Sequence, residues 1–190
     1  MTSSPTQRSF RSLKARRQFH VMCRGFLLVL LGLFATSLPA QIPFDDAVQV
    51  AAGHSHTCAL KADGKVQCWG DNTYGQLGDG TTTRRLMGVP VSGLNGVIVI
   101  TAGGHHTCAV TNSGAALCWG GNSDGQLGDG SGLRRLTPVL VDGLDSGVAT
   151  ITAGDYHTCA VTTDGAALCW GYNRRPPAFS SGAVWNPALL

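Results

Sequence analysis

The sequence predicts an all-β fold built from tandem repeats, and three observations support this prediction. The 190-residue chain contains 26 glycines, which weaken helix interiors, and only 13% of its residues are charged. All 11 of its acidic residues are Asp, which favours turns over helix interiors. A segment with one pattern of Cys, Trp and Gly occurs three times, at intervals of 50 and 51 residues. Self-similarity at such a period is typical of repeat architectures.

Residues 1–40 have the features of an export signal. They carry six basic residues and no acidic one, and they include the apolar stretch 26–38 (FLLVLLGLFATSL). This stretch is shorter than the about 20 residues that a membrane-spanning helix needs. Small residues at Ser37 and Ala40 offer cleavage positions. We therefore predict an N-terminal signal helix and a body that is periplasmic, at the cell surface or extracellular.

Alternatives to this assignment remain open. Met22 is a second candidate start, Arg16-Arg17 resembles a twin-arginine export motif, and an uncleaved membrane anchor is a further alternative. Residues 41–48 are expected to form a linker. Without residues 1–40 the chain holds eight basic and 11 acidic residues, a net charge of −3. A nucleic-acid binder needs a basic surface on its folded part, so no nucleic-acid partner and no membrane span are expected in the mature chain.

Three copies of one motif account for most of the remaining chain: repeat 1 at 49–98, repeat 2 at 99–149 and a partial repeat 3 at 150–173. Each copy contains Ala-Gly-x-x-His-Thr-Cys-Ala, followed by Leu or Val and then by Cys-Trp-Gly. Repeats 1 and 2 continue alike through Gly-Gln-Leu-Gly-Asp-Gly and Arg-Arg-Leu. Residues 174–190 lack this pattern and are expected to be a non-repeat tail. We interpret the abrupt change as a frameshift or truncation scar, with a real capping segment as the alternative.

Each copy also predicts a β-hairpin. The apolar–polar alternation after the motif's Thr is interrupted by Ala-Asp-Gly at 62–64, and three-residue loops of this kind commonly place Gly in the left-handed region. Such a loop pairs residue 61 with 65 and, counting outward, Cys58 with Cys68. The cysteines then form a non-hydrogen-bonded pair, in which the two Cα atoms lie about 4.5 Å apart. The equivalent segments of repeats 2 and 3 predict the same register.

This register predicts one disulfide in each repeat. The six cysteines concerned are Cys58 with Cys68, Cys108 with Cys118, and Cys159 with Cys169. The seventh, Cys23, lies in the export signal, and an even count in an exported body is typical of a disulfide framework. A zinc site formed by His56, Cys58 and Cys68 is the alternative, although these cysteines lack the Cys-x-x-Cys spacing of zinc knuckles. No metal and no cofactor are predicted.

The repeats resemble the regulator-of-chromosome-condensation repeat, also called the α-tubulin-suppressor-type repeat, and above all its exported bacterial branch with paired cysteines. The resemblance rests on the Ala-Gly-x-x-His-Thr-Cys-Ala run and on Cys-Trp-Gly-x-Asn-x-x-Gly-Gln-Leu-Gly-Asp-Gly, and it covers roughly 49–173. It implies a β-propeller with four-stranded blades, usually about seven to a ring. We therefore expect a partial propeller, with two complete blade-type repeats plus part of a third. Because blades cover their apolar faces with their neighbours, the bare terminal faces are expected to promote self-association.

Residues that recur in every repeat are expected to be structural, because a catalytic residue is rarely needed in each copy. We expect each recurring His to hydrogen-bond within its own blade, and each recurring Trp to pack between blades, with an aromatic binding surface as the alternative. The recurring glycines are expected in turns with positive φ. These residues are His56, His106, His157, Trp69, Trp119, Trp170, Gly75, Gly78, Gly125 and Gly128.

Other conspicuous residues give weak signals. His54 and His105 occupy non-equivalent loop positions, and the arginine pairs at 84–85 and 134–135 are expected on a solvated strand edge. No arrangement typical of nucleophilic or acid–base catalysis stands out, so the protein is not predicted to be an enzyme. We predict a non-catalytic exported repeat module that binds another, unidentified protein through variable loops on a rigid scaffold.

Three other functions stay open. The first is a truncated or frameshifted gene product without independent function. The second is a polysaccharide-acting enzyme, which needs acid–base residues that occur in one copy only. The third is a nucleotide exchange factor, because the family that the repeats resemble includes such factors. None of that family's active residues can be placed in this sequence.

Overall fold

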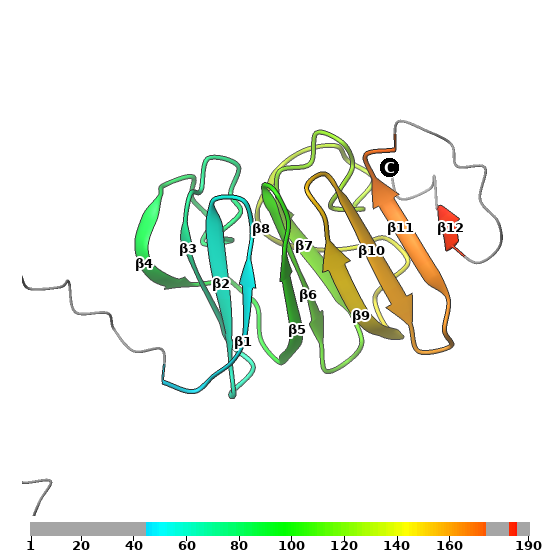
Figure 1. Ribbon diagram of the computed structural model, residues 1–190, viewed down its shortest axis with the longest axis horizontal. Helices are drawn as coiled ribbons and strands as arrows, with labels where there is room; N and C mark the ends of the chain where they lie inside the picture. Colours follow the sequence, from blue (N-terminus) through cyan, green and yellow to red (C-terminus); the bar gives the residue numbers. More distant parts are fainter. Residues whose placement is uncertain (1–44, 174–182, 186–190) are drawn as a thin grey trace, which may run out of the picture. The chain divides into compact units, whose positions relative to one another are not determined.

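The computed structural model describes residues 45–173 and 183–185, and every regular element in these ranges is a β-strand. The strands form three four-stranded sheets, which lie next to one another in chain order (Figure 1). The predicted all-β fold with blade-type repeats is therefore confirmed. Blade 1 comprises β1 (Ala47–Ala52), β2 (His56–Lys61), β3 (Val66–Gly70) and β4 (Arg85–Pro90). Blade 2 comprises β5 (Val97–Ala102), β6 (His106–Thr111), β7 (Ala116–Gly120) and β8 (Arg135–Leu140). Blade 3 comprises β9 (Val148–Ala153), β10 (His157–Thr162), β11 (Ala167–Gly171) and β12 (Ala183–Trp185).

The export signal expected at 1–40, its helix included, lies outside the described residues. Residues 41–44 of the expected linker lie there too, whereas its last two residues belong to β1, which begins at Ala47. No helix within 45–173 or 183–185 is long and apolar enough to cross a membrane.

Each blade is centred on the hairpin that the sequence predicts. In blade 1, Leu60 pairs with Val66 and Cys58 with Cys68. The loop between them places Gly64 at a φ of 78°, and the Lys61 N–H donates to the Lys65 carbonyl over 2.9 Å. Blades 2 and 3 repeat this register. The structure joins the six cysteines as three disulfides across these hairpins, each with its Cα atoms 4.1 Å apart.

Blade 3 differs from the others in its fourth strand. In blades 1 and 2, β4 and β8 run antiparallel to β3 and β7. In blade 3, β12 runs parallel to β11, and Cys169 pairs with Trp185. The tail expected at 174–190 therefore supplies a strand, although its direction departs from the repeat. Residues 174–182 and 186–190 lie outside the described part of the chain.

The hydrophobic core lies between blades rather than within one. Between blades 1 and 2, the Cys58–Cys68 disulfide, Leu60 and Val66 pack against residues of blade 2 that include Trp119. The next junction repeats this arrangement with the Cys108–Cys118 disulfide and Trp170 of blade 3. Because successive residues of a strand point to opposite faces, each Cys-Trp pair places its Cys toward the following blade and its Trp toward the preceding one.

Gly78 shows why the long loops need glycine at these junctions. Its φ is 68°, in the left-handed region that side chains disfavour. A Cβ atom there would lie 2.7 Å from Nε1 of Trp119, which is closer than two such atoms can approach. Gly128 has the same relation to Trp170, at a φ of 67° and 2.7 Å. The Gly-Gln-Leu-Gly segment is thus shaped to receive the Trp of the next blade.

Candidate functional site

A chain of buried hydrogen bonds crosses the junction between blades 1 and 2. His56 Nε2 lies 2.8 Å from the Thr107 hydroxyl, and that hydroxyl donates to the Gln76 carbonyl over 2.8 Å. Nε1 of Trp119 donates to the same carbonyl over 3.0 Å. Two donors from blade 2 therefore converge on one carbonyl of blade 1, while blade 1 supplies the histidine in return.

The junction between blades 2 and 3 repeats these contacts. His106 Nε2 lies 2.9 Å from the Thr158 hydroxyl, which donates to the Gln126 carbonyl over 2.8 Å. Nε1 of Trp170 donates to that carbonyl over 3.0 Å. The structure changes one expectation here, because the recurring histidines bond to the following blade and not within their own. His157, in blade 3, is exposed, and no hydrogen bond of its ring is seen within the described residues.

The direction of these bonds fixes the histidine tautomer. A carbonyl only accepts, so the Thr107 hydroxyl uses its proton on Gln76 and must accept a proton from His56 Nε2. The Nδ1 atoms of His56 and His106 are then unprotonated, and neither has a hydrogen-bond partner. A proton added at Nδ1 would be a buried, unpaired donor. Accordingly, burial lowers the pKa of His56 to about 4 and that of His106 to about 3, with nearby histidines adding repulsion.

This arrangement predicts loss of stability in mild acid. In the unfolded chain these histidines take up protons near pH 6.5, whereas in the folded protein they stay neutral to about pH 4 and pH 3. Stability is therefore greatest above pH 6.5 and falls as the pH drops through this window, by on the order of 3 kcal/mol for each histidine. Urea unfolding measured between pH 7 and pH 4 checks this.

The matched controls are His106→Gln and His157→Gln. Gln can donate its amide N–H to Thr158 without titrating, so His106→Gln should flatten the pH dependence. His157→Gln should leave it unchanged, because His157 is exposed. An equal effect of both substitutions would contradict the assignment of the slope to the junctions.

The long loop between β3 and β4 is organised by Asn72. Its Oδ1 accepts from the Leu77 N–H and its Nδ2 donates to Asp79 Oδ1, both over 3.0 Å. Asp79 forms an ion pair with Arg85 over 2.8 Å. Burial raises the pKa of Asp79, but hydrogen bonds from Thr81 and Arg85 outweigh it and hold the pKa below its usual value. The loop is therefore a rigid frame.

Repeat 2 builds the same frame from Asn122, Asp129 and Arg135, with the ion pair at 2.6 Å. The two arginine pairs are thus not simply a solvated strand edge. Arg85 and Arg135 fasten the loops, whereas Arg84 and Arg134 are exposed. Reasoning from the sequence missed the Asn–Asp–Arg set, although its recurrence at equal spacing in both repeats was available as a signal.

The rigid loops and the β1–β2, β5–β6 and β9–β10 turns lie at one end of the blades, which we call the loop face. This follows from the antiparallel strand order, which places the β2–β3 and β6–β7 hairpin loops at the other end. Aromatic side chains gather on the loop face. The rings of Tyr74 and His105 lie 4.8 Å apart, and those of Tyr156 and Tyr172 lie 6.1 Å apart. All three tyrosines are more than 40% exposed.

A depression of about 350 Å³ lies among these residues. Tyr74 comes from the blade 1 loop, His105 and Arg134 from blade 2, and Tyr156 from the β9–β10 turn. Apart from Arg134, whose counterpart in repeat 1 is Arg84, these side chains occupy positions that differ between repeats. Tyr74 corresponds to Asp124 in repeat 2, and Tyr172 corresponds to Asp71 and Gly121. The repeated frame thus carries a variable, aromatic surface.

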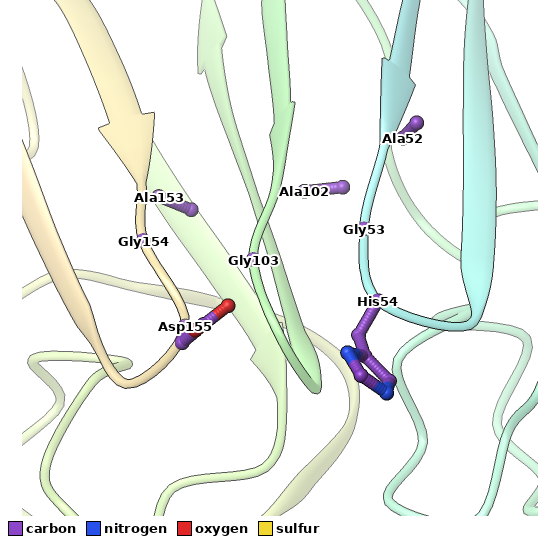
Figure 2. Close-up of a pocket in the computed structure, with 8 residues that line it drawn as sticks. All are labelled: Ala52, Gly53, His54, Ala102, Gly103, Ala153, Gly154 and Asp155. Carbon is purple, nitrogen blue, oxygen red and sulfur yellow. The ribbon is translucent and has the colours of Figure 1, made fainter.

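A second hollow, of about 280 Å³, lies along the ends of β1, β5 and β9. Figure 2 shows Ala and Gly residues of the three strands side by side, with His54 and Asp155 on opposite sides. Most of its lining has no reactive side chain. Its main polar features are backbone contacts between blades, such as the His54 N–H that donates to the Gly103 carbonyl over 3.3 Å.

Groups with metal-binding chemistry do not converge in the described part of the chain. In 45–173 and 183–185 no three His, Cys, Asp or Glu side chains lie close enough to hold an ion. The structure does not support the zinc alternative at His56, Cys58 and Cys68. The two cysteines form a disulfide with each other, and His56 bonds to Thr107 of the next blade.

Sequence comparisons match the repeats directly. Two profiles described as the regulator of chromosome condensation (RCC1) repeat match the chain, one at 47–76, 97–126 and 148–175, the other at 63–110 and 113–161. The chain is 44% identical over 52 residues to the probable E3 ubiquitin-protein ligase HERC4 of Homo sapiens, covering 23% of this chain and 5% of that protein. It is 47% identical over 49 residues to human E3 ubiquitin-protein ligase HERC2, covering 26% of this chain and 1% of that protein.

Comparison with solved structures agrees. Human WBSCR16 aligns with a TM-score of 0.63 and 25% identity, over 74% of this chain and 37% of that one. Prp20p of Saccharomyces cerevisiae, whose structure was reported with its binding properties to Gsp1p and histones, aligns with a TM-score of 0.56 and 29% identity. That match covers 66% of this chain and 30% of the yeast chain. The protein thus spans a small part of each of these relatives.

The profile matches, the three blade-type sheets and the repeated junctions agree with one another. This chain belongs to the family of proteins built from regulator of chromosome condensation (RCC1) repeats.

Proposed function

We propose that this protein is an exported, non-catalytic binding module whose loop face recognises another protein. The observation that carries the proposal is the cluster of Tyr74, His105, Arg134 and Tyr156 around one depression on a rigid frame. Tyr and Arg are enriched among the residues that dominate binding energy at protein interfaces. Tyr also offers a large contact area with little loss of side-chain freedom.

The separation of buried junction residues from variable loop residues supports this proposal. At the two junctions, the histidines, threonines and tryptophans that could suggest chemistry are buried, and their hydrogen bonds join one blade to the next. They are His56, His106, Thr107, Thr158, Trp119 and Trp170. The residues that vary between repeats lie in the loops, where they are free to differ without disturbing the blades. Variable loops on a fixed scaffold are suited to recognition. Binding to Gsp1p and histones is reported for the related Prp20p, which is consistent with a binding role for such repeats.

The disulfides support the exported part of the proposal. Three disulfides in so short a chain are typical of proteins that leave a reducing cytosol. Together with the basic and apolar features of residues 1–40, they favour a periplasmic, cell-surface or extracellular location. Mass determination of the protein recovered from envelope and culture fractions tests both the location and the cleavage.

The loop-face test compares matched variants in affinity capture from envelope extracts. Tyr74→Ala combined with Tyr156→Ala should reduce capture of a specific partner by about tenfold or more, because truncating interface hot spots costs at least about 2 kcal/mol. Asn95→Ala combined with Thr163→Ala alters exposed residues at the opposite end of the blades and should leave capture unchanged. Equal capture by both variants would count against the loop face.

A further inference from the structure

The outer face of blade 1, which points away from blade 2, has the features of an unfilled blade junction. Val50 occupies the position held by Ile100 in blade 2 and Ile151 in blade 3, since each pairs with the equivalent Ala of the next strand. Ile100 and Ile151 are 1% and 4% exposed, because a preceding blade covers them, whereas Val50 is 61% exposed. Thr57, the counterpart of buried Thr107, is partly exposed.

The outer face of blade 3 is the complementary half of the same kind of junction. Val161 is 38% exposed, whereas its counterpart Val110 is fully buried beneath blade 3. The Cys159–Cys169 disulfide is partly exposed, whereas the Cys108–Cys118 disulfide is fully buried. His157 is exposed. It is the counterpart in blade 3 of His106 in blade 2, which bonds to Thr158 of the following blade.

The polar groups of the two faces are also complementary. Within the described residues, neither the His157 ring nor the Thr57 hydroxyl forms a hydrogen bond. At each junction inside the chain, this same pair of positions is joined by a bond of 2.8 or 2.9 Å. A blade 1 face placed on blade 3 in the way that blade 3 sits on blade 2 would restore the bond and bury Val50 against Val161.

We propose that the protein associates head to tail, with the outer face of blade 3 of one copy receiving the outer face of blade 1 of a second. The occupant is a second copy because the interface continues one that the chain already forms twice, with apolar, Thr and His residues at the equivalent strand positions. The Gly-Gln-Leu-Gly segment that receives the Trp at both internal junctions does not recur in repeat 3, so the contact rests on the strands alone. The contact is heterologous, so each copy uses both faces and the assembly either closes into a ring or grows. This association is independent of binding at the loop face.

The test blocks one face at a time in the full chain. Val50→Arg places a charge on the blade 1 face and Val161→Arg on the blade 3 face, where burying an unpaired charge is costly. Sedimentation velocity from micromolar to millimolar concentration should show association of the unmodified protein. Each variant alone should sediment as a monomer, with association weakened by at least about tenfold.

An equimolar mixture of the two variants gives the decisive result. Each partner still has one intact face, so the mixture should form a one-to-one dimer and nothing larger. Ile98→Arg, which alters an exposed residue of the middle blade, is the matched control and should associate like the unmodified protein. Complete disulfide formation shows that each variant has folded.

Three results would overturn the proposal. One is an unmodified protein that stays monomeric at every concentration, as when residues outside the described part cover either face. Another is a variant that still associates alone, which indicates a symmetric contact of one face with itself. The last is a mixture that stays monomeric although the unmodified protein associates.

Discussion

Replacing Trp119 with Ala is expected to lower the free energy of unfolding by about 4 kcal/mol, within the range for truncating a buried aromatic residue. Trp119 is fully buried and packs between blades 1 and 2 with the Cys58–Cys68 disulfide, Leu60 and Leu77. Its loss leaves a cavity and removes one of the two donors to the Gln76 carbonyl. Urea unfolding measures the change. It is monitored by the circular dichroism of the backbone, because the variant lacks one tryptophan.

Trp69→Ala is the matched control, because Trp69 holds the same position in blade 1 and is only partly buried. Its effect should be less than half as large. Trp170→Ala, in contrast, should match Trp119→Ala, since Trp170 is fully buried at the second junction and donates to Gln126. Equal losses at all three positions would argue that the tryptophans act within their blades and not between them.

Removing the disulfides is expected to have the second large effect. Each closes a loop between cysteines ten residues apart. The closed loop lowers the conformational entropy of the unfolded chain, and this stabilises the folded state by about 3 kcal/mol. Three such contributions are comparable with the whole stability of a typical domain, about 5–15 kcal/mol. Full reduction should therefore unfold the protein at moderate temperature, as circular dichroism with and without reductant would show.

Single-disulfide variants separate the chain constraint from the packing. The Cys108–Cys118 sulfurs are fully buried in the core between blades 2 and 3, whereas the Cys159–Cys169 pair is partly exposed. Cys108→Ala with Cys118→Ala should therefore cost more stability than Cys159→Ala with Cys169→Ala. Without reductant, a thiol reagent should label none of these six cysteines. Labelling of the native protein at these positions would contradict the assignment.

The elements that sequence reasoning predicted well are local. The hairpin register follows from a three-residue loop ending in Gly64, and the loop also determines that Cys58 faces Cys68. The direction of Trp69 then follows from strand alternation. Each step uses residues within a dozen positions of one another, where turn geometry alone restricts the backbone to very few arrangements.

The features that were missed depend on how one blade meets the next. The partner of His56 is Thr107, 51 residues away in the next blade. A repeat pattern does not show whether a hydrogen bond joins two neighbouring blades or lies within one blade. The strand at 183–185 was also missed, because a short segment without repeat character carries no signal for a parallel pairing with β11. The Asn72–Asp79–Arg85 frame joins side chains from both ends of a long loop, whose course no turn pattern in the sequence predicts.

The surface proposed for binding could not be found from sequence for a related reason. Tyr74, His105 and Tyr156 come from three different repeats and occupy two non-equivalent positions in the motif. Only the packing of the blades brings them around one depression. The sequence does show that these positions vary, while the His, Thr, Cys and Trp residues of the junction strands recur in all three repeats.

The central claim is that the junction residues form a scaffold and the loop face binds. Its most direct test places a photo-crosslinking amino acid at Tyr156 or at Thr163, which lie at opposite ends of β10 and are both exposed. Irradiation in envelope extracts, followed by mass spectrometry, should give a specific crosslinked partner from position 156 and none from position 163. A partner crosslinked only from position 163, or equally from both positions, would contradict the account.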